Sequence, residues 1–101
     1  MTNTTTTPRT EAVIRPARPK LHKVLLVNDH YTPREFVVRV LRAEFRMDEG
    51  QSYRVMLTAH QRGVCVVAVF TQEIAEEKAT RATDMAREAG FPLLFITEPE
   101  E

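Results

Sequence analysis

The sequence has few of the residues that oxidative folding and covalent catalysis require. Its 101 residues include one cysteine, one serine and no tryptophan. Cys65 alone cannot form an internal disulfide, which is typical of a protein kept in a reducing cytoplasm. No stretch reaches the roughly 18 apolar residues of a membrane span, and the opening MTNTTTT lacks the apolar stretch of a secretory signal. We therefore expect a cytoplasmic protein without a membrane anchor.

The same scarcity argues against an enzyme or a metal protein. The three glycines fall at or near expected helix boundaries and form no phosphate-binding loop. Cys65 lies inside the apolar run VCVVAVF, where a buried and unreactive thiol is expected, and Ser52 lies in a helix start. His22, His30 and His60 have no metal-ligand spacing. We expect no catalytic residue, no metal and no cofactor.

Charge is divided unevenly along the chain. Residues 1–20 contain four basic side chains and one acidic one, a net charge of +3, and the rest contains ten basic and thirteen acidic ones, a net charge of −3. The first segment also has a threonine run and three prolines, and too little apolar surface to order itself. We predict a flexible N-terminal extension at 1–20, a core domain at 21–98 and a frayed tail at 99–101. A basic extension suits nucleic acid or an acidic protein, or simply keeps a tail soluble.

Three apolar, strand-like segments and three amphipathic, helix-like segments make up the core. Their boundaries follow from hydrophobic spacing and from capping and turn residues. The predicted elements are a strand at 21–28, a helix from Thr32 to about Met47, a helix from Asp48 to Gly63, a strand at 64–70, a helix from Thr71 to Gly90 and a strand at 93–97.

The order of these elements predicts the fold class. Two helices between the first and second strands make those strands antiparallel, and the third strand then runs with the second. With the first strand in the centre, every pairing is antiparallel and all three helices can cover one face. We predict an α+β fold, a two-layer β-α-α-β-α-β sandwich with a three-stranded antiparallel sheet covered on one face by three helices.

Capping residues and inner faces of the helices can also be predicted. Thr32 is expected to cap the first helix, with Pro33 at its first position and Glu35 completing a capping box. Asp48 and Thr71 are expected to cap the other two. The predicted inner faces hold Tyr53, Met56, Leu57 and His60 in the second helix, and Ala75, Ala79, Ala82, Ala86 and Ala89 in the third.

The segment NDHYTP at residues 28–33 is the most informative candidate site. It leaves the carboxyl end of a predicted buried strand and opens a helix, where polar groups can surround a small concave site, and the helix dipole favours an ionised Asp29. Asn28 and Asp29 equally fit an Asx-type turn with a structural role only. His60 is either a hydrogen-bonded core histidine or a polar tip at the edge of an apolar pocket.

Three stretches, VLLVNDHYTPREFVVRVL, MLTAHQRGVCVVAVFTQEIAEEK and FPLLF, resemble the ClpS adaptor family. The resemblance covers about residues 20–98. It rests on an Asn-Asp turn followed by Tyr-Thr-Pro-x-Glu-Phe-Val and on a Met-Leu-x-x-His helix end. Members of this family are bacterial adaptors that deliver substrates with destabilising amino-terminal residues to the ClpAP protease. The resemblance implies that this chain binds the free α-amino group and the bulky hydrophobic first side chain of N-degron substrates.

The resemblance also implies a set of site residues. Asn28, Asp29 and His60 would accept hydrogen bonds from the α-ammonium group, whose three donors need three acceptors. Thr32 would contact the substrate backbone. The pocket for the first side chain would be lined by residues that otherwise read as ordinary core, namely Val37, Met56, Ala59 and Leu93.

Two positions at the pocket rim depart from the family pattern. Family members commonly carry an acidic residue where this chain has His30, and a methionine where it has Arg34. Losing a carboxylate and gaining a cation both oppose the binding of a cationic amino terminus, so we expect weaker or narrower binding. In the family that methionine is credited with excluding β-branched first residues, whereas Arg34 would lay its methylene stem over the pocket mouth.

The segment TQEIAEEK resembles the family's docking surface for the N-domain of a ClpA-type AAA+ unfoldase. On that basis Glu73 and Lys78 are assigned to docking, although without the resemblance they fit an ordinary solvated helix face. Residues 1–20 match the extension that such adaptors use during hand-off to the unfoldase. We expect a monomer that binds neither nucleic acid nor membrane.

Two rival interpretations stay open. The same element order also resembles the C-terminal domain of the bacterial ribosomal stalk protein, an interaction domain with no amino-terminus recognition, in which Asn28, Asp29 and His60 would have no binding role. A nucleic-acid module that relies on the basic extension is the other. Both predict equal affinity for free and acetylated peptide amino termini.

Overall fold

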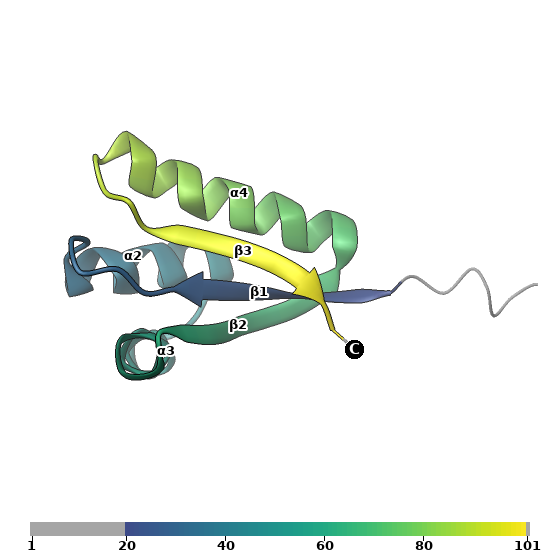
Figure 1. The fold of residues 1–101 in the computed structure, drawn as a ribbon, viewed down its shortest axis with the longest axis horizontal. Helices are drawn as coiled ribbons and strands as arrows, with labels where there is room; N and C mark the ends of the chain where they lie inside the picture. The colour runs from purple at the N-terminus through teal and green to yellow at the C-terminus, as the bar shows by residue number, and fades with distance from the viewer. Residues whose placement is uncertain (1–19, 101) are drawn as a thin grey trace, which may run out of the picture.

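The structure, a computed structural model, describes residues 20–100. The predicted extension therefore falls, except for Lys20, outside the described residues. The element order matches the prediction. The elements are β1 (Leu21–Val27), α2 (Arg34–Phe45), α3 (Glu49–Arg62), β2 (Val64–Thr71), α4 (Gln72–Glu88) and β3 (Leu94–Pro99) (Figure 1). No helix among residues 20–100 is long and apolar enough to cross a membrane.

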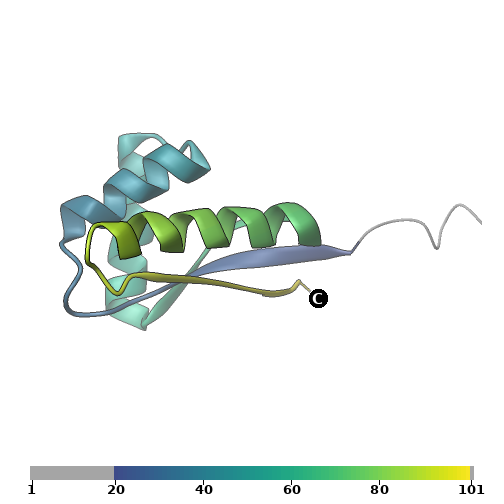
Figure 2. The same ribbon diagram turned by 90° about the horizontal axis from the view of Figure 1, so that it is seen from above.

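The sheet has the predicted topology. Its strand order is β2-β1-β3 and both pairings are antiparallel, so the α+β fold class is confirmed. Helices α2 and α4 lie together on one side of the sheet (Figure 2). Helix α3 is seen end-on beside β2 in Figure 1, and it leads directly into that strand. The end of α3 therefore lies next to the end of β1.

The start of α2 differs from the predicted capping box. The helix begins at Arg34 with Pro33 at the N-cap, and no side chain caps it. Thr32 lies one residue before this N-cap, and its hydroxyl donates to the Asp29 carboxylate at 2.9 Å. The helix ends at Phe45, and the left-handed Arg46 (φ 57°) stops it shortly before the predicted Met47.

The predicted ends of α3 are confirmed, but of its predicted inner face only Met56 is buried. Asp48 accepts from the Gln51 N–H at 2.7 Å, and Gly63, with φ of 91°, ends the helix. The face that packs inward holds Ser52, Met56 and Ala59. Tyr53 and His60 are exposed and Leu57 is only half-buried, because the helix is turned about one residue from the predicted orientation.

The small-residue face of α4 is confirmed except at its end. Ala75, Ala79, Ala82 and Ala86 are buried, whereas Ala89 is exposed beyond the last turn. Thr71 occupies the N-cap position but makes no side-chain cap hydrogen bond. Small side chains let α4 lie close to the sheet, where the Thr83 hydroxyl accepts from the Phe95 N–H at 3.0 Å.

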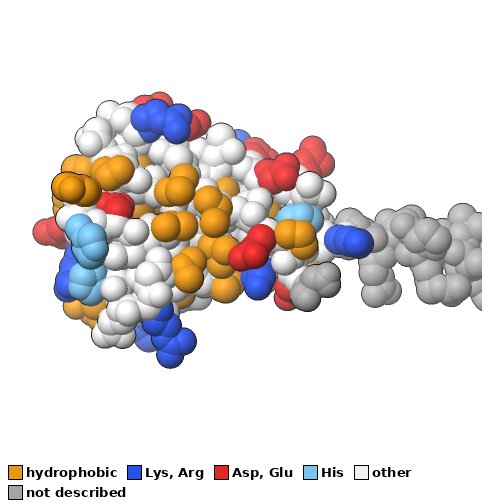
Figure 3. Space-filling model, in the orientation of Figure 1, with side chains coloured by type: hydrophobic (Ala, Val, Ile, Leu, Met, Phe, Trp, Pro, Cys, Tyr) orange, Lys and Arg blue, Asp and Glu red, His pale blue; other side chains and the backbone are white. Residues whose placement is uncertain are grey.

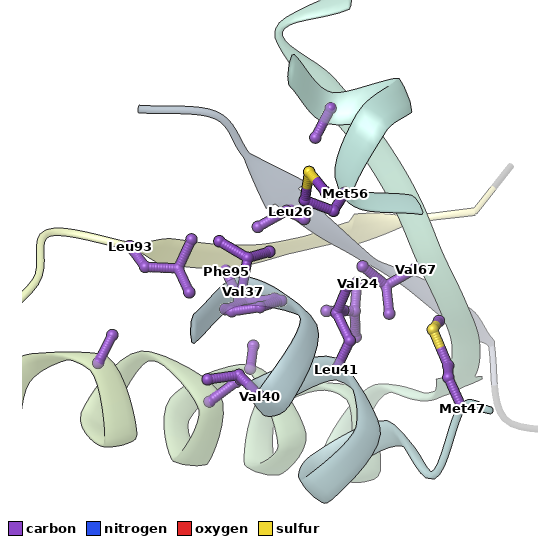
Figure 4. Packing of buried hydrophobic residues seen from close by; sticks show 14 of the residues in the cluster. Val24, Leu26, Val37, Val40, Leu41, Met47, Met56, Val67, Leu93 and Phe95 are labelled. Atoms are coloured by element: carbon purple, nitrogen blue, oxygen red, sulfur yellow. The ribbon is translucent and has the colours of Figure 1, made fainter. Parts of the chain in front are cut away.

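One continuous core fills the space between the sheet and the helices (Figure 4). Val24 and Leu26 of β1 meet Val40 and Leu41 of α2, and all four are at most 1% exposed. Phe95 of β3 stacks on Phe45 of α2, with 5.6 Å between ring centroids. The most deeply buried side chains are therefore aliphatic, and Phe95, which is 4% exposed, is the aromatic ring packed among them.

The other face of the sheet is aliphatic and open among the described residues. A bulge in β2 between Val66 and Ala68 adds Val67 to the strand, so Val66 pairs with Leu25 and Ala68 with Val24. The exposed side chains gather in the middle of the face that Figure 3 shows. They are Val64, Val66, Val69, Leu94 and Ile96, each between 39% and 47% exposed.

The carboxyl end is more ordered than predicted. Strand β3 continues to Pro99, and the Glu100 N–H donates to the Leu21 carbonyl at 2.9 Å. The prediction of a frayed tail beginning at residue 99 is therefore wrong for Pro99 and Glu100, because the central strand provides backbone partners that local sequence does not reveal. Glu101 lies outside the described residues.

Replacing Ala82 by leucine tests how tightly α4 lies against the sheet. Ala82 is 0% exposed, so extra methylene groups force neighbouring side chains apart, and we expect a loss of about 1–3 kcal/mol in the free energy of unfolding. Ala43→Leu on the exposed face of α2 serves as the control and should change stability by less than about 0.5 kcal/mol. Urea unfolding measures both, and equal stability of the two variants would contradict the close packing.

Candidate functional site

A small hollow opens where β1 ends, α2 begins and α3 ends. Its volume is about 130 Å³, close to the roughly 150 Å³ of an engineered apolar cavity that binds benzene. The residues that line it come from these three elements and from the segment before β3. They are Leu26, Asn28, Asp29, His30, Thr32, Arg34, Val37, Met56, Ala59, His60 and Leu93.

All ten residues predicted for the substrate site line this one hollow, although they are spread from position 28 to position 93. Their binding roles stay predictions, because the structure contains no ligand. The sequence analysis missed Leu26, which is 1% exposed. Side chains two apart on a strand share a face, so the strand period could have placed Leu26 beside Asn28.

A backbone contact brings the two polar halves of the hollow together. The Asn28 N–H donates to the Gly63 carbonyl at 3.0 Å, directly after the last β1–β2 pair, Val27 with Val64. Gly63 is also the left-handed residue that ends α3, and its N–H donates to the Ala59 carbonyl. Asn28 is thereby held against the last turn of α3, the turn that carries His60.

Asp29 organises the turn between β1 and α2. Its Oδ1 accepts from the Tyr31 N–H at 2.8 Å and from the Thr32 N–H at 2.7 Å, and its Oδ2 accepts from the Thr32 hydroxyl at 2.9 Å. The predicted Asx-type turn is therefore present. A carboxylate has about four lone-pair sites, so one site on Oδ2 stays open for a further donor.

These hydrogen bonds keep Asp29 ionised. Partial burial by itself raises the pKa of this carboxyl, but the N–H groups of Thr32 and Tyr31, the Thr32 hydroxyl and the nearby His30 together lower it further, and the net pKa is below the ordinary aspartate value. The hollow therefore has a fixed negative charge at neutral pH.

The rest of the hollow is apolar and rigid. Leu26, Val37, Met56, Ala59 and Leu93 are each at most 7% exposed. In Figure 4 the labelled Leu26, Val37, Met56 and Leu93 come from separate segments and surround a common space. Because these side chains belong to the main core, the shape of the hollow is fixed by the packing of the whole domain.

The outer edge of the hollow is polar and exposed. His60 lies here, at the end of α3, so the interpretation of His60 as a core histidine is wrong. His30 and Arg34 are also exposed and line the hollow. At this edge the Asp29 carboxylate is accompanied by the Arg34 cation, and His30 stands where family members commonly carry a second acidic residue.

The residues predicted to dock an unfoldase lie elsewhere, on α4. Glu73 is exposed in its first turn. The Lys78 ammonium donates to the Glu44 carbonyl at 3.0 Å and lies 3.9 Å from the Glu44 carboxylate. Positions five apart on a helix point roughly 140° apart, and Lys78 therefore faces α2 and joins the two helices while Glu73 faces a different direction.

Residues 20–100 contain no group of three histidine, cysteine or acidic side chains that could hold a metal ion. Cys65 points toward the inner side of the sheet and is half-buried rather than fully buried. Burial raises the pKa of its thiol, although Arg62 acts in the opposite direction. A raised pKa makes the thiol a poorer nucleophile at neutral pH.

Replacing Asp29 by alanine should destabilise the protein in a pH-dependent way. Because the folded-state pKa is lowered, the stabilisation is present above the unfolded value of about 3.9 and is lost as the pH falls through the folded value. We expect Asp29→Ala to cost about 1–2 kcal/mol at pH 7 and much less at pH 3, as measured by urea unfolding.

Asp84→Ala is the matched control, because Asp84 pairs with Arg87 on the exposed surface of α4 at 3.2 Å. Such surface pairs contribute at most about 1 kcal/mol. An Asp29 effect of the same size at pH 7 and pH 3 would show that its charge does not stabilise the turn.

Comparisons with known proteins agree with the geometry. Residues 17–96 match the family model described as ATP-dependent Clp protease adaptor protein ClpS. The chain is 67% identical to ATP-dependent Clp protease adapter protein ClpS 1 of Rhodopseudomonas palustris and 62% identical to ClpS 1 of Bradyrhizobium diazoefficiens, each over the full length of both chains.

A solved structure is also similar. The structure of Agrobacterium tumefaciens ClpS2 bound to L-phenylalaninamide has a TM-score of 0.81 and 63% sequence identity, and covers 82% of this chain and 100% of its own. The family model and the full-length relatives together establish the family. The chain belongs to the ClpS family of Clp protease adaptor proteins.

Proposed function

We propose that this chain binds N-degron substrates by their free α-amino group and bulky hydrophobic first side chain, and delivers them to the ClpAP protease without catalysing a reaction itself. The observation that carries the proposal is the composition of the hollow. Its edge holds hydrogen-bond acceptors, its interior is apolar, and its volume suits a benzene-sized group. This combination matches the two parts of an amino-terminal residue.

The polar edge suits an ammonium group. Such a group has three N–H donors, and the hollow offers the Asn28 amide oxygen, the open site of Asp29 Oδ2 and a ring nitrogen of His60. The Thr32 hydroxyl already donates its proton to Asp29. Thr32 therefore contacts the substrate backbone as an acceptor, from an N–H group of the peptide.

The apolar interior suits the first side chain. Burying a leucine or phenylalanine contributes about 1.5–3 kcal/mol. The Agrobacterium tumefaciens relative was solved with L-phenylalaninamide, a compound that pairs an α-amino group with a benzyl side chain. The same ligand chemistry fits Asn28, Asp29 and His60 beside the walls formed by Val37 and Met56.

Delivery requires a second surface, and we propose the first turns of α4 for it. The partner would be the N-domain of a ClpA-type unfoldase, acting on a monomeric adaptor in the bacterial cytoplasm. Glu73 is exposed and available for such docking. Lys78 also joins α4 to α2 through Glu44, so its contribution to docking would be accompanied by a structural one. This surface is separate from the residues that line the hollow.

Acetylation of the substrate provides the direct test. Acetylation removes the charge and two of the three donors, and each charge-assisted hydrogen bond contributes about 1.5–3 kcal/mol. We expect a Leu-initiated peptide to bind at least about a hundredfold more tightly than its acetylated twin, as measured by isothermal titration calorimetry. Equal affinity for the two peptides would reject the proposal and favour the ribosomal-stalk type of interaction domain.

A panel of first residues tests the selectivity of the hollow. We expect Leu and Phe to bind best. Trp should bind more weakly because the volume is only about 130 Å³, and Ile and Val about tenfold more weakly because their β-branch comes close to the Arg34 side chain that lines the hollow. Ile binding as tight as Leu binding would show that β-branched residues are not excluded.

Arg34→Met should tighten binding, since it removes a cation that repels the ammonium.

A further inference from the structure

A second apolar depression lies beside the hollow, between α2 and α3. We call it the α2–α3 groove, and its volume is about 490 Å³. Its apolar surface includes the ring of Tyr53, a side chain that is 49% exposed and has no part in the proposed ammonium site or first-residue pocket. The residues that line the groove are Arg34, Glu35, Val38, Glu49, Gly50, Tyr53 and Met56.

The groove and the hollow are neighbours that share a wall. Met56 and Arg34 line both of them. Met56 is 3% exposed and belongs to the core, so its position is fixed by packing. Arg34 is the first residue of α2, and its side chain is exposed. A ligand that leaves the hollow past Met56 therefore enters the groove directly.

The direction of α3 sets the order of the hollow and the groove along this helix. His60 lies in the last turn of this helix, Met56 about 6 Å earlier along its axis, and Tyr53 about 4.5 Å before Met56. A peptide with its amino group at His60 that runs toward the start of α3 passes the hollow first and the groove second.

The spacing of an extended peptide fits this arrangement. Successive side chains point to opposite sides, and residues rise by about 3.3 Å each, so the first and third side chains share a side about 7 Å apart. When the first side chain occupies the hollow and the peptide runs toward the start of α3, the third side chain faces the groove. We propose that the α2–α3 groove is a subsite for an apolar third residue of the substrate, an inference that depends on the proposed amino-terminus binding.

The charges around the groove favour an apolar occupant. Its edge holds Arg34 together with Glu35 and Glu49, which have opposite signs, and all three are exposed. No single charge therefore dominates the edge. Val38, Tyr53 and Met56 offer apolar surface, and covering the Tyr53 ring removes the largest exposed part of it from water.

Three free-amino peptides that begin Leu-Ala-Ala, Leu-Ala-Phe and Leu-Phe-Ala test the subsite. We expect the Phe at the third position to tighten binding about threefold to tenfold over Leu-Ala-Ala, because an open groove buries only part of the ring. The same Phe at the second position points away from the groove and should give no comparable gain. Isothermal titration calorimetry measures all three affinities.

Substitutions at Tyr53 assign the gain to the groove. Tyr53→Ala should abolish the advantage of Leu-Ala-Phe and leave the affinity for Leu-Ala-Ala within about twofold. Tyr53→Phe retains the ring and should retain the advantage. Ile74→Ala is the matched control, because Ile74 is 44% exposed on α4, away from both depressions.

The outcomes separate this inference from the proposed function. If Leu-Ala-Ala binds with a free amino group and not when acetylated, but a third-position Phe brings no gain, the subsite is overturned and the amino-terminus site stands. A gain that survives Tyr53→Ala also overturns the subsite. If free and acetylated peptides bind equally, or neither binds, the proposed function fails and the subsite fails with it.

Discussion

The candidate site depends above all on one backbone hydrogen bond, from the Asn28 N–H to the Gly63 carbonyl. It joins the residue that follows β1 to the residue that caps the end of α3. Gly63 can occupy this position because glycine adopts a positive φ without steric cost, which lets the chain leave the helix and enter β2 at once. Asn28 and His60 are thereby brought to one edge, although 31 residues separate them.

The protein combines a rigid pocket with a lightly charged edge. Its apolar walls are core side chains, so preorganisation of the pocket is part of the stability of the domain and needs no separate ordering on binding. The carboxylate of Asp29 has two structural tasks, holding the Tyr31 and Thr32 amides and fixing the Thr32 hydroxyl. The same bonds that make the turn also keep the Asp29 carboxylate ionised.

The sequence predicted the elements, the strand order and the set of ten residues that line one hollow, because these follow from local signals or from a specific motif. It failed where tertiary contacts decide. Thr32 resembles a helix cap, but Pro33 takes the N-cap position, and Asp29 holds both the N–H and the hydroxyl of Thr32 in the preceding turn. The orientation of α3 was predicted one residue off, because Tyr53 was counted as core when Ser52 is the buried residue. Glu100 was expected to fray because the local sequence does not reveal its backbone partner, Leu21, which lies at the opposite end of the folded domain in the sequence.

The bulge in β2 has a consequence for the length of the chain. On either side of the extra Val67, the strand pairs with β1 in a register that points Val66 and Val69 to the open face of the sheet. Deleting Val67 would join these two stretches into a regular ladder, and each neighbouring side chain would stay on the same face of the sheet. A relative one residue shorter in this strand therefore keeps the same sheet and the same hollow, and its core lacks only the buried Val67 side chain.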